Sequence, residues 1–185
     1  MVQNSYTTER LKLNRLNLND APFIFELLNT EGWITFIGDR NMKSKEDAQE
    51  YIRKTLVDPN IHYWLVQTKK EKLSIGLISF IKRDYLEHYD LGFAFLPAFQ
   101  HKGFAYEAAH KVLCDRLKDA DHKTILATVM PENLNSLKLL QKLGFQRIKK
   151  MEHDHKRLLL YGIRKNQILP YTCLGNSKDK QTRKT

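Results

Sequence analysis

One long amphipathic helical pattern, residues 103–120, lies between strand patterns on both sides of it. Its apolar residues recur at the i, i+3 and i+4 spacing of a helix with one buried face: Ala105, Ala108, Ala109, Val112, Leu113 and Leu117. That face is small and aliphatic, so it suits close packing against a sheet. The pattern therefore predicts a fold in which helices cover a β-sheet.

Strand and helix patterns alternate along the rest of the chain. Alternating or β-rich runs predict seven strands, at about 9–17, 62–68, 73–83, 89–96, 123–129, 145–150 and 156–164. Three further segments have capped helical patterns, at 20–28, 44–56 and 133–143. Residues 30–41 follow neither period, so we expect an aromatic-bearing loop there. This order predicts an α/β (α+β) domain with a mixed seven-stranded sheet and helices on both faces.

The chain has 185 residues, which is the usual size of one domain. We expect residues 1–170 to form that domain and residues 171–185 to form a polar, basic, disordered tail. Lys and Arg number 31 against 21 Asp and Glu, a net charge of +10 that attracts polyanions without choosing among them. No apolar run approaches the ~18 residues that span a bilayer, and no apolar signal region begins the chain. A cytoplasmic monomer or homodimer without a membrane partner is expected.

Residues 95–109 (FLPAFQHKGFAYEAA) lead from a strand through a short turn directly into the long helix. Such a junction points free backbone N–H groups and the positive helix end at whatever lies in front of it. Gly103 removes the Cβ that would block close approach, so an anionic pyrophosphate would suit this turn. The alternative is that Gly103 only permits a tight turn.

Asn133 and Ser136 are three residues apart at a helix start, so both side chains face the same side of the first turn. By themselves they could be a helix cap or a catalytic pair. His153-x-His155 lacks a third ligand at suitable spacing, which favours a solvated turn over a metal site. No metal is therefore expected.

Together, these segments resemble the GNAT superfamily of N-acetyltransferases, and within it the RimJ/RimL-like branch that acts on ribosomal-protein N-termini. Gln100-x-x-Gly103-x-Ala105 resembles the family's Arg/Gln-x-x-Gly-x-Gly/Ala loop for the coenzyme A pyrophosphate. Asn133-x-x-Ser136 with Lys142-x-Gly144-Phe145 resembles a second signature, and Thr8-Glu-Arg-Leu-Lys-Leu13 resembles the first strand of the branch. Gln100 in place of Arg and Ala105 in place of Gly are departures within the family's range. The resemblance covers residues 7–165.

The resemblance implies a mostly antiparallel sheet and direct transfer of an acetyl group from acetyl-CoA to a primary amine in a ternary complex. The acceptor would be a protein or peptide N-terminus or a small amine. Two strands that splay apart, at 89–96 and 123–129, would offer backbone groups to the pantetheine arm. The implied cofactor-binding residues are Phe93, Phe95, Gln100, His101, Lys102, Gly103, Phe104, Ala105 and Asn133.

The resemblance also implies catalytic roles for Ser136 with Asn133 and for Asp90. Ser136 would protonate the departing thiolate, as in members that lack a catalytic Tyr. Asp90 would be the general base, through a water, because the histone acetyltransferase branch has a base carboxylate at the corresponding place. The alternative for Asp90 is an exposed strand-start residue paired with Lys or Arg.

A non-catalytic module that binds CoA, or RNA or the ribosome, is the rival function. The net charge and the basic tail favour it. The absence of an RNP-like aromatic motif or a zinc knuckle argues against an RNA-binding code.

Overall fold

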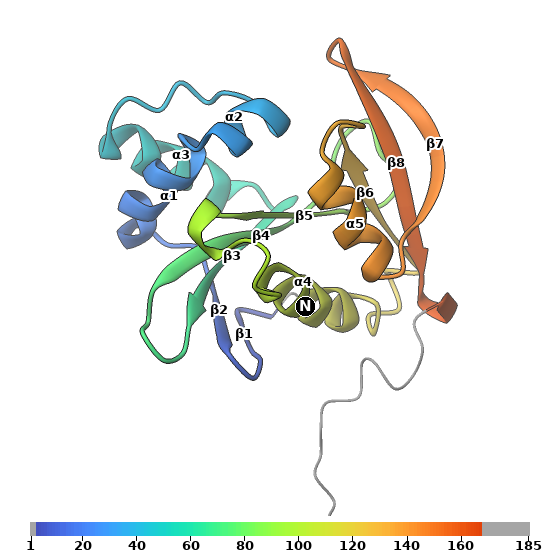
Figure 1. The fold of residues 1–185 in the computed structure, drawn as a ribbon, viewed down its shortest axis with the longest axis horizontal. Helices are drawn as coiled ribbons and strands as arrows, with labels where there is room; N and C mark the ends of the chain where they lie inside the picture. The colour runs from blue at the N-terminus through green and yellow to red at the C-terminus, as the bar shows by residue number, and fades with distance from the viewer. Residues whose placement is uncertain (1–2, 168–185) are drawn as a thin grey trace, which may run out of the picture.

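An eight-stranded sheet forms the centre of the fold in the computed structural model, which describes residues 3–167 (Figure 1). The predicted tail, 171–185, and the last residues of the predicted domain lie outside that range. The strand order is β1-β2-β3-β4-β5-β6-β8-β7. The strands are β1 (Ser5–Thr7), β2 (Leu11–Arg15), β3 (Ile61–Thr68), β4 (Ser74–Ile81), β5 (Asp90–Phe95), β6 (Thr124–Val129), β7 (Gln146–His153) and β8 (Lys156–Arg164).

The prediction of seven strands is wrong by one. β1 pairs antiparallel with β2 but has only three residues, of which Tyr6 alone is buried. A strand of that length is too short to be recognised from an alternating pattern. Every neighbouring pair is antiparallel except β5 and β6, which are parallel. The mixed, mostly antiparallel sheet is therefore confirmed.

Helices cover both faces of the sheet (Figure 1). On one face, α1 (Ala21–Leu28), α2 (Glu31–Phe36) and α3 (Lys45–Val57) pack over β3 and β4. On the other face lie α4 (Phe104–Arg116) and α5 (Leu134–Lys142). Short 3-10 turns occur at Leu18–Asp20, Pro97–Phe99 and Lys165–Gln167. Within residues 3–167, no helix is long and apolar enough to cross a membrane.

Helix boundaries follow the capping signals more closely than the hydrophobic period. Ser44 and Asp47 form a capping box that begins α3, and Gly144 ends α5 with a φ of +91°. The long helix ends at Arg116, four residues before the predicted end. The predicted loop at 30–41 contains α2, whose first turn is capped by the Thr30 hydroxyl. Only Trp33 of that helix is buried, so it has no periodic apolar face.

The parallel pair β5–β6 determines where the predicted site residues lie. Each strand is followed by a helix, α4 after β5 and α5 after β6, so both helix N-termini lie at the same edge of the sheet (Figure 1). The small face of α4 packs on the sheet through Ala108, Ala109 and Val112, as the sequence predicts.

Candidate functional site

The turn before α4 has the shape of an anion cradle. Gly103 is the N-cap of α4, with a left-handed φ of +80°, and His101 before it has a φ of +58°. No described residue accepts a hydrogen bond from the backbone N–H groups of residues 101–103, and the first N–H groups of α4 have no partner within the helix. A turn of this kind fits a phosphate group, because its N–H donors and the helix dipole point outward.

A clamp from the N-terminal segment holds this turn in place. The Thr8 hydroxyl and the Arg10 backbone N–H donate to Glu107 Oε1 at 2.6 and 2.9 Å. The Arg10 Nε donates to Glu107 Oε2 at 2.6 Å, and its Nη1 donates to the Lys102 carbonyl at 3.1 Å. Burial alone would raise the pKa of Glu107, but the hydrogen bonds from Thr8 and Arg10 lower that pKa below its usual value. Sequence reasoning missed Arg10, although it lies inside the Thr8–Leu13 motif.

The predicted residues of the loop are brought together around this clamp. The Gln100 side chain donates to the Phe95 carbonyl at 3.0 Å, which ties the loop to the end of β5. The Arg10 guanidinium lies 4.4 Å from the Phe104 ring centre, and the Lys102 ammonium lies 5.4 Å from the Phe99 ring centre. Ala105 packs against the core. His101 and Lys102 are exposed, so their side chains are available to a ligand in the loop.

β5 and β6 separate after a single paired position, Asp90 opposite Leu126. The Leu126 N–H donates to the Tyr89 carbonyl at 2.9 Å, so the odd-numbered residues of β5 turn their backbone groups toward β6. Phe93 and Phe95 lie beyond the separation, on that open edge. The structure thus places the two predicted pantetheine contacts where strand partners are missing among the described residues.

Asp90 lies at the point of separation and is only 2% exposed. Its Oδ1 accepts the Thr128 backbone N–H at 2.9 Å, and its Oδ2 accepts the Arg83 Nε at 2.5 Å. Burial raises the pKa of Asp90, and the charge of Arg83 opposes that rise. The general-base role stays a prediction. The pairing with an arginine agrees with the alternative, but the residue is buried rather than exposed.

Asn133 and Ser136 begin α5, as predicted. Asn133 is the N-cap, and its Oδ1 accepts the Ser136 backbone N–H at 3.0 Å. The Ser136 side chain is half-buried, and its hydroxyl bonds to no described residue. α5 packs against α4, where the Lys142 ammonium lies 4.6 Å from the Tyr106 ring centre. The hydroxyl of Ser136 is therefore the free polar group of this pair.

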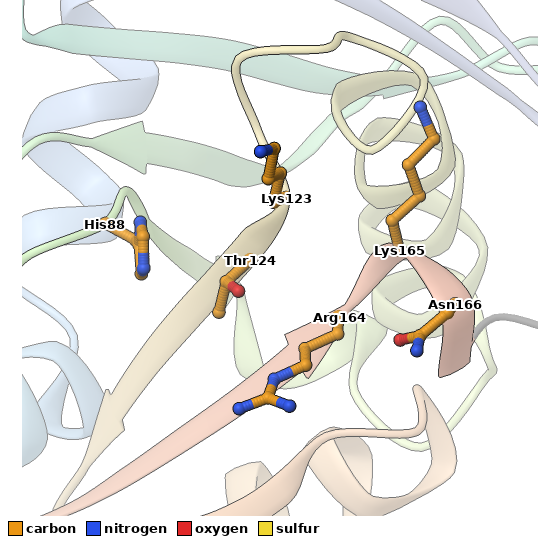
Figure 2. A pocket seen from close by; sticks show the side chains of 6 residues that line it. All are labelled: His88, Lys123, Thr124, Arg164, Lys165 and Asn166. Atoms are coloured by element: carbon orange, nitrogen blue, oxygen red, sulfur yellow. The ribbon is translucent and has the colours of Figure 1, made fainter.

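Two other features of the described chain lie away from these residues. His153 stacks on Tyr85, and no three His, Cys, Asp or Glu side chains within residues 3–167 are arranged to hold a metal. An open hollow of about 580 Å³ lies at the opposite end of β6 from Ser136 (Figure 2). Figure 2 shows that Lys165 points away from Arg164, and its Nζ instead contacts the Lys118 carbonyl at 3.3 Å. The hollow is lined by His88, Lys123, Thr124, Arg164, Lys165 and Asn166.

Comparisons with known proteins agree with this geometry. Residues 10–146 match the family described as an acetyltransferase (GNAT) domain. The chain is 30% identical over 141 residues to YnaD of Bacillus subtilis, an uncharacterized N-acetyltransferase, covering 76% of this chain and 82% of that one. It is similar in fold to a ribosomal-protein-S5-alanine acetyltransferase from Vibrio fischeri, with a TM-score of 0.74, 19% identity and coverage of 91% and 100%. A spermidine N-acetyltransferase from Vibrio cholerae, solved with CoA and spermine, gives a TM-score of 0.73, 20% identity and coverage of 86% and 98%.

Proposed function

The chain belongs to the GNAT family of acetyltransferases, and we propose that it moves the acetyl group of acetyl-CoA to a primary amine by direct attack in a ternary complex. The observation that carries this proposal is the pairing of an open strand edge with an anion cradle. Phe93 and Phe95 lie on the open edge of β5, and Gly103 begins α4 at the end of the same segment. A long cofactor with a polar arm and a pyrophosphate needs both features.

The residues of this site fit acetyl-CoA, which would supply an activated thioester. The N–H groups around Gly103 and Phe104 would hold the pyrophosphate, with Lys102 and His101 adding side-chain donors. Backbone groups of Phe93 and Phe95 would hold the pantetheine arm as a neighbouring strand would. The Arg10–Glu107 clamp keeps the cradle in shape without contacting the reacting atoms.

We assign Ser136 the role of proton donor to the departing thiolate. Its hydroxyl has no competing partner among residues 3–167 and lies one turn from the Asn133 cap. Asn133 would act by fixing the first turn of α5 and therefore the position of that hydroxyl. A hydroxyl that meets charge only as the thiolate forms stabilises the transition state more than the bound substrate.

The acceptor is an amine, and we favour a protein or peptide α-amine because of the resemblance to the ribosomal-protein branch. The structural neighbours named above include one named for a ribosomal-protein alanine and one named for spermidine. The segment containing α2, residues 30–43, is where we expect the choice to be made. In this segment Trp33 is buried, while Ile34 and Ile37, which follow it, are exposed.

The test is thiol release from acetyl-CoA by the purified protein in the presence of a mixed panel of peptides and small amines. We expect at least one acceptor to raise the rate above that of hydrolysis. CoA binding or tight RNA binding without acceptor-dependent release would instead support the non-catalytic module.

A further inference from the structure

We propose that the Asp90–Arg83 pair sets the point at which β5 and β6 separate, so that Asp90 is a positioning residue for the cofactor arm and not the proton acceptor. The inference rests on the proposed function, because the separated strands are where acetyl-CoA would lie. Asp90 begins β5, and Arg83 lies in the β4–β5 connection, two residues after β4 ends.

The hydrogen bonds at the separation depart from a regular parallel ladder. Since the Leu126 N–H donates to the Tyr89 carbonyl, the Thr128 N–H should donate to the Leu91 carbonyl one step later. It donates instead to Asp90 Oδ1 at 2.9 Å. The side chain thus takes the place of the next backbone acceptor. The Leu91 carbonyl is left on the open edge with Phe93 and Phe95.

Arg83 fixes the orientation of that carboxylate. Arg83 lies two residues after the end of β4, and its Nε donates to Asp90 Oδ2. The side chain of Asp90 is 3% exposed and that of Arg83 is 33% exposed. Removing Arg83 would leave the buried carboxylate of Asp90 without a compensating charge, and removing the carboxylate would leave Arg83 without its partner. The position of the Thr128 N–H, and hence of β6, is therefore coupled to both residues.

The same contacts disfavour proton transfer by Asp90. A general base must come within about 2.6–3.2 Å of the proton it takes, or reach it through one water. Each Asp90 oxygen already accepts a hydrogen bond from a fixed donor, and protonation would cost the ion pair with Arg83. The two roles can be distinguished. A base requires a carboxylate that can accept a proton, whereas a positioning residue requires only the hydrogen bonds, which amide side chains can also make.

A double-mutant cycle tests the proposal with Asp90→Asn, Arg83→Gln and the double variant. Each single change should weaken CoA binding, measured by calorimetry, roughly ten-fold. It should also speed hydrogen exchange of the Thr128 amide, measured by NMR. In the double variant, the side-chain carbonyl of the introduced glutamine can accept from the side-chain amide of the introduced asparagine, so both properties should recover most of their wild-type values.

Activity supplies the reading that separates the two roles. If Asp90 is a positioning residue, the KM for acetyl-CoA rises in the single variants, and their pH–rate profiles overlay that of the wild type. The kcat of the double variant then returns to the wild-type value. If the double variant stays as slow as Asp90→Asn and recovers only at high pH, Asp90 is the base and the proposal is overturned. Single variants with wild-type CoA affinity and Thr128 exchange would overturn it as well.

Two controls keep the outcome clear. Glu50→Gln with Arg53→Gln removes an exposed ion pair on α3 and should change none of these readings. A wild-type protein that does not bind CoA would count against the proposed function, while Thr128 exchange in the variants would still test the role of Asp90. If a single variant does not fold, the comparison of wild type with the double variant decides.

Discussion

Gly103 is the residue on which the shape of the cradle depends most directly. Its φ of +80° is a conformation that side chains with a Cβ rarely adopt, and an added Cβ would lie 3.3 Å from the Arg10 Nη2. The residue therefore supports both the turn and the approach of Arg10. Of the two alternatives that the sequence left open, the structure shows the tight turn, and the pyrophosphate site stays a prediction.

Gly103→Val should abolish the rise in melting temperature that acetyl-CoA gives to the wild type. A left-handed backbone at a branched residue costs about 1–3 kcal/mol, and the side chain would occupy the space of the pyrophosphate. Gly32→Val is the matched control, because nothing lies within 4 Å of the Cβ it would add. A folded Gly103→Val protein with full CoA affinity would remove Gly103 from the site.

Ser136→Ala should lower kcat by about 10²- to 10⁴-fold, the usual contribution of a general acid, with little change in CoA affinity. Asn133→Ala provides the contrast, because losing the cap of α5 should reduce the free energy of unfolding by about 0.5–2 kcal/mol. Both are measured by steady-state kinetics together with urea unfolding. An unchanged kcat in Ser136→Ala, with chemistry rate-limiting, would leave Ser136 as a helix-start residue only.

Among the elements, those with a full hydrophobic period were predictable and those held by tertiary contacts were not. β3 and β4 were predictable because each is a β-rich run of eight residues, and α3 was predictable because a capping box begins its 13 residues. β1 and α2 are too short to show one. The separation of β5 from β6 was expected from the family resemblance alone, because the pair that we propose sets it, Asp90 with Arg83, meets only after β4 and β5 pair. Arg10 meets its partner Glu107 across 97 positions, so no local pattern could show it.

Gly76→Ala should destabilise the junction of β4 and β5 by about 1–3 kcal/mol, the usual cost of overpacking a core. Gly76 pairs with Phe95, and its Cβ would lie 2.4 Å from that ring. Since Phe95 ends β5 just before the cradle, CoA affinity should fall too. Gly32→Ala in α2 should instead stabilise the protein by about 0.5–1 kcal/mol, because an unhindered helical position gains propensity. Equal changes in chemical unfolding for the two variants would contradict this account.

At the scale of the whole molecule, stability depends on pH through groups that the fold keeps from ionising normally. His62 on β3 is the clearest of them. Burial, followed by the positive charges of Arg15 and Arg116, lowers its pKa from 6.5 to about 4. The Arg15 Nη1 lies 2.8 Å from its Nδ1, which fixes the neutral ring as an acceptor.

The wild type should lose stability as the pH falls from about 6.5 toward 4. Between these pH values His62 is protonated in the unfolded chain but stays neutral in the folded protein. The contribution of His62 to the free energy of unfolding is therefore fully present only above pH 6.5. His62→Gln keeps an acceptor for Arg15 and removes the titration, so its stability should fall less over the same range. Urea unfolding at several pH values measures the difference. Parallel curves for the two proteins would exclude His62 as a source of the acid sensitivity.

The clamp that Thr8 and Arg10 form on Glu107 also has a consequence for the order of folding steps. Thr8 and Arg10 reach Glu107 across 99 and 97 positions of the chain, so the loop gains its support only after β2 has entered the sheet and α4 has docked. A fragment starting beyond Arg10 would contain every motif residue of the loop and would still lack the clamp that holds the loop in place. During refolding, CoA binding should therefore recover later than secondary structure. Its rate of recovery should report the rate of the last docking step.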